Sequence, residues 1–291
     1  MSKPAKYREL LRSGKTIWAA GAYDALSAKL IEEAGFDVVM TSGFAVSASL
    51  LGQPDVELYT MTENLGVGKN VCNAVSVPVI ADTDTGYGNA INVMRTVREF
   101  EQVGVAGVIL EDQQSPKRCP ACTDQIEIIS KEEGVAKIRA AVAARRNPDL
   151  VIIARTDARD PAEAMARGKA YAEAGADIIQ PISRTFKDIA GLRAMRQAVG
   201  KPLSLQILGW LEKDLSQAEI ESVAGMATYA LVPLMTVAAA LRQNLAVLHK
   251  NKSVKGLPIP VVGHNEFNAF IGFAEVEALQ LKYLEMPQAA E

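Results

Sequence analysis

The segment Gly107-Val-Ile-Leu-Glu-Asp112 is a short apolar run that ends in two carboxylates, and Val151-Ile-Ile-Ala-Arg155 is a second run of the same kind. Neither run alternates apolar with polar residues, which is typical of parallel strands that are covered on both faces. Each run is followed by a segment of helical periodicity. Strands that alternate with helices must be parallel, because each crossover helix returns the chain to the same edge of the sheet.

The alternation of strand and helix extends outward from these two segments over most of the chain. Eight strands are predicted, over residues 16–22, 37–42, 78–82, 107–112, 150–155, 177–181, 202–208 and 227–233. The helices predicted after them cover residues 24–34, 61–75, 89–103, 131–145, 161–174, 186–199, 216–224 and 235–249. Eight such units close a barrel in roughly 250 residues. The sequence therefore predicts an α/β fold, a (β/α)8 TIM-type barrel.

An open, doubly wound sheet is the structural alternative. It is disfavoured because Gly86-Tyr-Gly88 is not followed by the third glycine of a dinucleotide-binding fingerprint. We predict a single barrel domain over residues 1–291, with 250–291 as a C-terminal helical extension. An apolar helix pattern from Glu266 to Leu284 lies outside the eight units, so we expect it to pack on the outside of the barrel or on a neighbouring subunit.

The composition excludes several classes of protein. Hydrophobic residues make up 49% and charged residues 22% of the chain, which excludes disorder. A net charge of -3 gives no sign of a nucleic-acid partner. No apolar run approaches the roughly 20 residues of a membrane helix, and the polar N-terminal segment lacks a signal core. The three cysteines are too few for a disulfide scaffold. We therefore expect a cytoplasmic protein with reduced thiols.

Polar residues gather at the predicted carboxyl ends of neighbouring strands, where barrels of this kind build their sites. The strand ends read Thr41-Ser42-Gly43, Asp82-Thr-Asp84-Thr-Gly86, Glu111-Asp112-Gln113 and Arg155-Thr-Asp157. Several carboxylates on adjacent strands form a ring of negative charge that needs a cation, and oxygen donors suit Mg²⁺. Ion pairs with Arg155 are the simpler alternative.

The connection Gln114–Ser130 is the second signal, because it is far longer than the usual βα loop of about 2–6 residues. A long loop over a barrel mouth is often a lid. Lys117 and Arg118 directly precede Cys119 and would favour its thiolate form. The alternative is a solvated basic loop with a spectator cysteine. A redox pair of Cys119 with Cys122 is disfavoured because it belongs to a thioredoxin-type fold, and a zinc site lacks nearby histidines.

Taken together, these motifs resemble those of the isocitrate lyase/phosphoenolpyruvate mutase superfamily. The segment Asp82–Gly88 is similar to its metal-binding D-x-D-x-G-x-G motif, and Glu111-Asp112-Gln113 with Lys117-Arg118-Cys119 is similar to the signature of its lyases. The Arg155-Thr-Asp157 strand, the Ser42-Gly43-Phe44 loop, Pro54-Asp55 and the tail from Glu266 also match. The resemblance covers essentially the whole chain and is closest to the methylisocitrate lyase, dimethylmalate lyase and oxaloacetate hydrolase branch.

The resemblance implies a set of site residues and a cofactor. It implies Mg²⁺, or Mn²⁺ in its place, held by Asp82, Asp84 and Glu111, and we expect Asp112 to lie close by. It implies catalytic roles for Cys119, Lys117 and Arg155, with Cys119 protonating the departing carbanion. Lys117 and Arg118 are expected to face the anionic substrate and hold the loop over it. The substrate-binding residues that follow from the comparison are Ser42, Gly43, Phe44, Asp55, Arg155 and Gln206. The family also implies a homotetramer with its last helices exchanged between subunits, and a small carboxylate substrate, with no nucleic acid or membrane partner.

The chain departs from the lyase pattern at four places. Two of them are Gln206-Ile-Leu-Gly209, where the family offers an asparagine, and Ala238, where methylisocitrate lyases carry an arginine. The glycine and histidine that follow the cysteine in the lyases are Pro120 and Ala121 here, and a glutamate near the end of strand six is Ile182. The less polar distal pocket argues against a tricarboxylate. We expect a Mg²⁺-dependent carbon–carbon lyase that cleaves a 2-hydroxy dicarboxylate, of methylisocitrate or dimethylmalate type, through a metal-bound enolate or alkoxide to a 2-oxo acid.

Three alternatives stay open at the level of sequence. The first is mutase chemistry at a P–C bond, on phosphonopyruvate or carboxy-phosphoenolpyruvate. The second is decarboxylation or hydrolysis of oxaloacetate within the same superfamily. The third is a non-catalytic barrel that only binds a metabolite. The presence of Cys119, Asp84 and Glu111 weighs against the third, since a binding protein has no use for an acid–base thiol.

Overall fold

The computed structural model describes residues 1–119 and 125–284. The chain divides into two compact units, Met1–Met235 and Thr236–Glu291, and each is described by itself. The expectation of one barrel domain with an extension from residue 250 stays a prediction.

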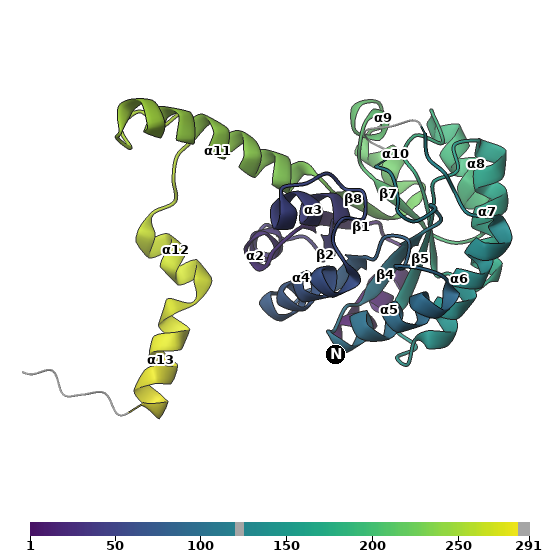
Figure 1. Cartoon of the computed structure of the whole chain (residues 1–291), viewed down its shortest axis with the longest axis horizontal. Coiled ribbons are helices and arrows are strands. Elements are labelled where there is room, and N and C mark those ends of the chain that lie inside the picture. Colours follow the sequence, from purple (N-terminus) through teal and green to yellow (C-terminus); the bar gives the residue numbers. More distant parts are fainter. Residues whose placement is uncertain (120–124, 285–291) are drawn as a thin grey trace, which may run out of the picture. The chain divides into compact units, whose positions relative to one another are not determined.

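The first unit is a closed barrel of eight parallel strands in sequence order, and pairing of β8 with β1 completes the ring (Figure 1). The predicted (β/α)8 TIM-type barrel is therefore confirmed. The strands are β1 (Ile17–Ala22), β2 (Val38–Thr41), β3 (Val79–Asp82), β4 (Gly107–Glu111), β5 (Val151–Thr156), β6 (Ile178–Pro181), β7 (Leu203–Gln206) and β8 (Ala224–Tyr229).

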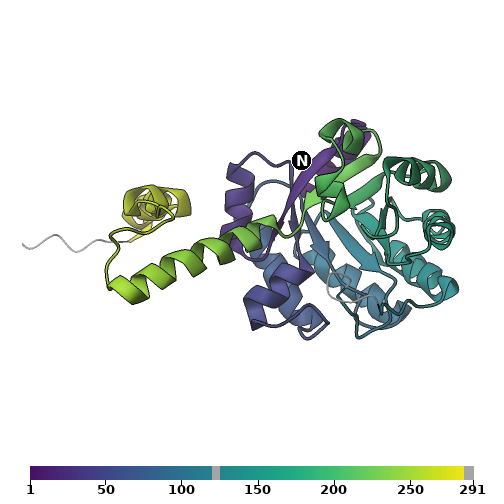
Figure 2. The same ribbon diagram turned by 90° about the horizontal axis from the view of Figure 1, so that it is seen from above.

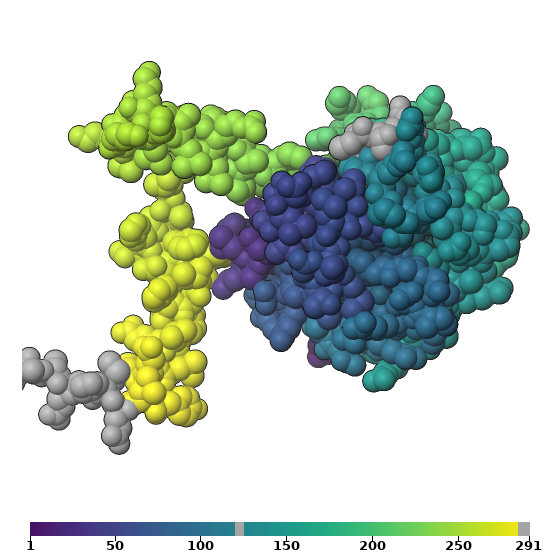
Figure 3. Space-filling view, viewed as in Figure 1, coloured from purple at the N-terminus to yellow at the C-terminus, as the bar shows by residue number. Residues whose placement is uncertain are grey.

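Helices surround this ring of strands (Figure 2). They are α1 (Lys3–Arg12), α2 (Ala25–Glu33), α3 (Gly43–Leu51), α4 (Met61–Ala74), α5 (Ala90–Gln102), α6 (Lys131–Ala144), α7 (Pro161–Glu173), α8 (Ile189–Val199), α9 (Trp210–Lys213) and α10 (Gln217–Glu221). In the space-filling view the side chains of α2 to α5 form a continuous outer surface (Figure 3). Helices α1, α3 and α9 were not predicted, and β8 ends at Tyr229 rather than at residue 233, because Pro233 already lies in the first turn of the next helix.

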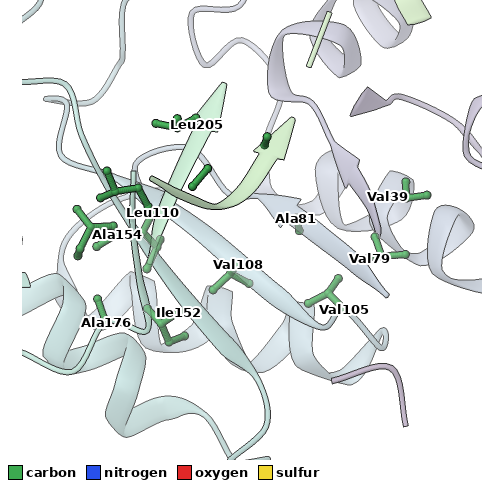
Figure 4. Packing of buried hydrophobic residues seen from close by; sticks show 14 of the residues in the cluster. Val39, Val79, Ala81, Val105, Val108, Leu110, Ile152, Ala154, Ala176 and Leu205 are labelled. Carbon is green, nitrogen blue, oxygen red and sulfur yellow. The ribbon is translucent and has the colours of Figure 1, made fainter. Parts of the chain in front are cut away.

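The strands are apolar on both faces, as their sequences indicate. Alternate side chains such as Ile109, Val151 and Ile153 point into the barrel and form one buried cluster. Their neighbours, among them Val108, Leu110 and Ile152, point outward and pack under the helices in a second cluster, part of which is shown in Figure 4. The period of two along each strand thus supplies both the inside and the outside core.

Helix α1 lies at the amino ends of the strands. Tyr7 belongs to the interior cluster, is fully buried and donates a hydrogen bond to Met226 Sδ at 3.1 Å. Arg8 donates to both carboxylate oxygens of Asp177, at 2.7 and 2.9 Å, and to the carbonyl of Leu150 at 3.0 Å. Asp177 and Leu150 immediately precede β6 and β5, so this helix ties the amino-terminal end of the barrel together.

The second unit continues α11 (Val232–Asn251) and contains α12 (His264–Ile271) and α13 (Phe273–Tyr283). The prediction of one helix over 266–284 is wrong, because Gly272 adopts a left-handed conformation with φ of 90° and ends α12. No residue of these three helices is buried. Across the described ranges of the chain, no helix is both long and apolar enough to cross a membrane.

Candidate active site

The carboxyl ends of β3 and β4 bring buried acids together around one lysine. The Nζ atom of Lys117 lies 2.5 Å from Asp84 Oδ1, 3.0 Å from Asp55 Oδ1 and 3.7 Å from Glu111 Oε1. Burial alone would lower the pKa of Lys117, but Asp84, Glu111 and Asp55 together hold that pKa well above its usual value. We call Asp55, Asp82, Asp84 and Glu111 the acid cluster; Lys117 is its resident cation.

Several carboxylate oxygens of the acid cluster accept no hydrogen bond from the described residues. Both carboxylate oxygens of Glu111 and Oδ1 of Asp84 are buried and accept no hydrogen bond of good geometry from residues 1–119 and 125–284. What they face at ion-pair distance is Lys117 and, for Glu111 Oε2, Arg155 at 2.9 Å. Burial raises the pKa of Glu111 well above its usual value, even though Arg155 and Lys117 act in the opposite direction. Such oxygens retain lone pairs for a further cation.

Asp82 lies beside a glycine that lets other groups approach closely. The backbone N–H of Gly43 donates to Asp82 Oδ2 at 3.3 Å. A Cβ atom at Gly43 would lie 3.0 Å from Asp82 Oδ2 and 3.2 Å from Asp84 Oδ1, so a side chain there would crowd the acid cluster. Burial, and secondarily the charge of Asp84, raise the pKa of Asp82 to about 6.

The acid cluster offers a divalent cation a suitable donor set. Its donors are oxygens alone, they are negatively charged, and several of them have no hydrogen-bond donor among the described residues. This chemistry fits Mg²⁺ or Mn²⁺. In the part of the chain that the structure describes, however, no group of three or more His, Cys, Asp and Glu is arranged to hold a metal by itself. Mg²⁺ typically takes only one or two carboxylates and fills its shell with water and substrate oxygens. The assignment of Asp82, Asp84 and Glu111 as ligands stays a prediction.

Arg155 forms ion pairs on two sides and also faces the open part of the site. It donates to Asp157 Oδ1 at 2.8 Å and lies 2.9 Å from Glu111 Oε2. Asp157 and Glu111 outweigh the effect of burial and raise the pKa of Arg155 well above its usual value. The ion-pair alternative is thus realised, and it does not remove Arg155 from the cavity wall. Asp157 belongs to the same strand-end motif, but the sequence had indicated no separate role for it.

Asp112 does not face the cation site, although we expected it near the metal. Its Oδ2 accepts hydrogen bonds from Tyr171 at 2.8 Å and from Arg167 at 3.2 Å, both on α7. Its Oδ1 accepts the backbone N–H of Asp157 at 2.8 Å. The expectation was wrong because consecutive residues of a strand point to opposite faces, so Glu111 faces inward while Asp112 faces the helix layer. Asp112 therefore supports the Arg155–Asp157 segment from behind.

Arg118 also departs from its predicted place. We expected it to face the anionic substrate, but its guanidinium donates to Gln125 within the same loop and lies 3.6 Å from Glu127. Its side chain is about half exposed. Lys117 and Arg118 are neighbours whose side chains do different things: the first enters the acid cluster, and the second ties the loop to itself.

A cavity of about 330 Å³ opens beside the acid cluster. Five residues predicted for substrate binding line it, and Cys119, which is only 5% exposed, lines it with them. The wall consists of Met40, Ser42, Phe44, Asp55, Asp82, Cys119, Arg155, Gln180, Ile182, Ser183, Arg184, Gln206, Leu208, Gly209, Trp210, Ala230 and Leu231. Gly43, the sixth predicted residue, contacts Asp82 instead. Cys122 lies outside the described residues.

Two residues that orient Asp84 were not anticipated. Asn64 Nδ2 donates to Tyr87 Oη at 2.8 Å and to the carbonyl of Asp82 at 2.8 Å. Tyr87 in turn donates to Asp84 Oδ2 at 3.1 Å. Asp84 has a φ of 49°, in the left-handed region that aspartate tolerates better than most residues. Asn64 lies within α4, where a single polar residue gives no signal of such a role.

Comparison with known proteins gives concordant results. The family model for phosphoenolpyruvate phosphomutase matches residues 7–248. The chain is 42% identical over 288 residues to 2,3-dimethylmalate lyase of Eubacterium barkeri, covering 97% of this chain and 99% of that protein.

Two solved structures share the fold over their whole length. The crystal structure of phosphoenolpyruvate phosphomutase from Streptomyces platensis subsp. rosaceus superimposes with a TM-score of 0.90 at 34% identity, covering 97% of this chain and 99% of that chain. A phosphonopyruvate hydrolase complex with oxalate and Mg²⁺ superimposes with a TM-score of 0.88 at 32% identity, covering 98% and 100%.

Proposed function

Because the chain belongs to the phosphoenolpyruvate mutase/isocitrate lyase superfamily, we propose that it is a Mg²⁺-dependent carbon–carbon lyase. Its substrate is a 2-hydroxy dicarboxylate with alkyl substituents, which it cleaves to a 2-oxo acid and a second carboxylate. The observation that carries this proposal is the position of Cys119. Its thiol lines the same cavity as Arg155 and Asp82, so a proton donor and a carboxylate-binding group face one space.

The reaction needs one bond broken and one proton delivered. The hydroxyl proton of the substrate goes to water, the oxygen becomes the carbonyl of the 2-oxo acid, and the electron pair of the adjacent C–C bond moves onto the carbon beside the second carboxylate. Cys119 then gives its proton to that carbon, and water returns a proton to the thiolate. Arg155, with its planar fork, binds a substrate carboxylate. A bound divalent cation, held by Asp82, Asp84 and Glu111, supplies electrostatic stabilisation of negative charge that develops on substrate oxygen.

The apolar side chains in the cavity wall favour alkyl substituents over a further carboxylate. Phe44, Ile182, Leu208, Trp210 and Leu231 all line the cavity. Ile182 occupies the position at which the lyases that this sequence resembles carry a glutamate. Burying a methyl group against such a wall is favourable, whereas an additional carboxylate would lose its hydration there.

Decarboxylation of oxaloacetate and mutase chemistry at a P–C bond are the alternatives within the family. Mutase chemistry transfers the phosphorus group and delivers no proton to carbon. Decarboxylation breaks a C–C bond and leaves the enolate of pyruvate, which water protonates without the thiol of Cys119. Both predict a protein that is indifferent to the loss of that thiol.

A substrate panel with Mg²⁺, and with excess EDTA as the metal-free control, tests the proposal. Initial rates of 2-oxo acid release are compared for malate, 2-methylmalate, 2,3-dimethylmalate, phosphonopyruvate and oxaloacetate. We expect kcat/KM to rise by at least about tenfold with each added methyl group, the lower scale for one buried methylene in a specificity pocket. Turnover of phosphonopyruvate or oxaloacetate alone would contradict the proposal and select one of the alternatives.

We also propose a homotetramer in which residues 266–284 cover part of another subunit. Apolar side chains of α11 and α13, among them Leu241, Leu245, Phe273 and Leu279, are more than half exposed in the single chain. Soluble monomers avoid apolar patches of this extent. Sedimentation velocity at micromolar concentration should give a tetramer, and a monomer would contradict this assignment.

A further inference from the structure

Glu57 connects three loops at the mouth of the barrel. Its Oε1 accepts a hydrogen bond from Thr85 Oγ1 at 2.6 Å. Its Oε2 accepts from Ser115 Oγ at 2.7 Å and from the backbone N–H of Lys117 at 2.9 Å. One carboxylate thus joins the segment after β2, the segment after β3 and the long loop after β4.

Each of these three loops carries a group of the candidate site. Thr85 directly follows Asp84, and Glu57 itself comes two residues after Asp55. Lys117 is two residues before Cys119, which lines the cavity. A displacement of Glu57 would therefore change the distances among Asp55, Asp84 and the loop that carries the thiol.

The backbone at Glu57 is in an unfavourable conformation. Its φ of 57° lies in the left-handed region, which glycine occupies readily and a glutamate rarely does. Residues keep such conformations where the surrounding structure over-determines them, and they gather at functional sites and switch regions. Here the three hydrogen bonds to the carboxylate fix the position.

Two other backbone hydrogen bonds of the long loop do not set its position over the mouth. The N–H of Gln114 donates to the carbonyl of Glu127 at 2.9 Å, and the N–H of Arg118 donates to Gln113 Oε1 at 3.0 Å. Both bonds join the loop to itself. The Glu57 carboxylate, by contrast, reaches across from another loop and binds the backbone of Lys117 itself.

We propose that Glu57 is a positioning residue. It holds the first part of the long loop, residues Gln114–Cys119, closed over the mouth of the barrel. By fixing the backbone of Lys117, its carboxylate lets the ammonium reach Asp84 and Asp55 and keeps the thiol of Cys119 in the cavity. The positioning is a property of the chain in the absence of substrate. Its effect on turnover rests on the proposed lyase function.

The test compares Glu57→Ala and Glu57→Gln with the wild type and with Glu127→Gln. The control removes an acidic side chain of the same loop that is 64% exposed and pairs only loosely with Arg118. Alkylation of Cys119 by iodoacetamide is followed by mass spectrometry without metal or substrate, and fragment ions separate it from Cys122. Buried Cys72 serves as the internal reference for global unfolding.

We expect Glu57→Ala to raise the alkylation rate of Cys119 by at least about tenfold, because local opening exposes groups that the closed loop protects. Hydrogen exchange of the Lys117 amide should accelerate in parallel, since that N–H loses its acceptor. Glu57→Gln keeps one oxygen acceptor, so its alkylation and exchange rates should lie between those of Glu57→Ala and the wild type. The rates of Glu127→Gln should match those of the wild type. If Glu57→Ala also exposes Cys72, the global fold is lost, and Ser115→Ala, which removes one donor to Glu57, decides in its place.

With a substrate that the wild type turns over, Glu57→Ala should lower kcat by about tenfold and leave KM within about twofold, since a mispositioned group costs rate rather than uniform binding. If the wild type cleaves no substrate of the panel, the proposed function fails while the alkylation and exchange results still decide on Glu57. Equal alkylation and exchange rates in Glu57→Ala and the wild type would overturn the positioning role.

Discussion

The two ends of the barrel compensate charged side chains in opposite ways: the ion pairs at the amino-terminal end are partly exposed, and the acids at the carboxyl-terminal end are buried. At the amino-terminal end, Arg8 and Arg145 both donate to Asp177, at distances of 2.7 to 2.9 Å, and Asp177 also accepts the backbone N–H of Ile152 at 2.9 Å. Each oxygen of this carboxylate thus has a directed donor. At the carboxyl-terminal end, Glu111 has two buried oxygens that accept no well-formed hydrogen bond from the described residues.

The difference separates stability from function. Fully hydrogen-bonded, partly buried ion pairs are costly to break, so they serve the fold. The acid cluster instead retains carboxylates whose pKa values burial has raised, as for Glu111 and Asp82. Buried carboxylate oxygens that accept no hydrogen bond in the folded protein can bind a metal ion or interact with a substrate. Substitutions at the two ends should therefore affect different measurements.

The largest effect on activity is expected for Asp84→Ala. This change removes the carboxylate nearest to Lys117 and a predicted metal ligand, so kcat/KM should fall by at least about 10³-fold, the scale of several kcal/mol that a catalytic metal contributes. Activation by Mg²⁺ should weaken in a titration of initial rate. The melting temperature should change little, because Lys117 keeps Asp55 and Glu111 as partners. Unchanged activation by Mg²⁺ would show that Asp84 does not serve the metal.

Cys119→Ala should lower kcat by at least about 10²-fold, the usual lower scale for a lost general acid. Substrate and metal should still bind, which isothermal titration with a substrate analogue can measure. Cys122→Ala is the matched control from the same loop and should have a much smaller effect, because Cys119 alone occupies the position of the lyase signature. Near-full turnover of Cys119→Ala would contradict the lyase mechanism.

At the opposite end, Asp177→Ala should leave kcat per folded molecule unchanged and reduce stability. The change leaves Arg8 and Arg145 without their carboxylate. Because the pair is partly exposed, the cost is below that of a fully buried pair, about 2–3 kcal/mol. At roughly 2–4 °C per kcal/mol, the melting temperature should fall by about 4–12 °C. Thermal denaturation and initial rates are measured for Asp177→Ala and Asp84→Ala side by side, since the first should lose stability and the second activity. Loss of activity without a fall in melting temperature would contradict the purely structural role of Asp177.

The smallest effect concerns Cys72, whose thiol lies on the buried face of α4. Burial raises the pKa of Cys72 to about 11 from an ordinary value of 9.0. Its unfolded form ionises first, so the stability that the neutral thiol contributes is complete below pH 9 and is lost as the pH rises to about 11. The loss is at most about 3 kcal/mol. Urea unfolding at pH 8 and pH 10.5 should show a smaller decline for Cys72→Ala than for the wild type, and equal declines would refute the assignment.

The sequence predicted the barrel because its strands are apolar on both faces and alternate with helices, a pattern that few folds other than a parallel barrel produce eight times in succession. It predicted that the acids would meet at the mouth, because the carboxyl ends of parallel strands share one end of a barrel. The errors follow from physics that the pattern does not contain. Asp112 faces α7 because strand residues alternate, and Gly272 ends a helix that its apolar pattern would have continued.

The role of Glu57 could not be predicted at all. It lies in a loop of irregular structure, and its partner Ser115 is 58 residues away along the chain. Nothing in the composition of either loop indicates that the two meet. Residues that act by joining loops are found only when the fold brings those loops together.

The most direct test of the lyase assignment is cleavage of 2,3-dimethylmalate in D₂O with Mg²⁺, followed by NMR. The proposed mechanism predicts pyruvate and propionate in equal amounts, with one deuterium on the methylene carbon of propionate, because a solvent-exchanged thiol delivers the proton to that carbon. With Cys119→Ala, both products should appear more slowly by the same factor. No cleavage of the C–C bond, or equal rates for the wild type and Cys119→Ala, would contradict it.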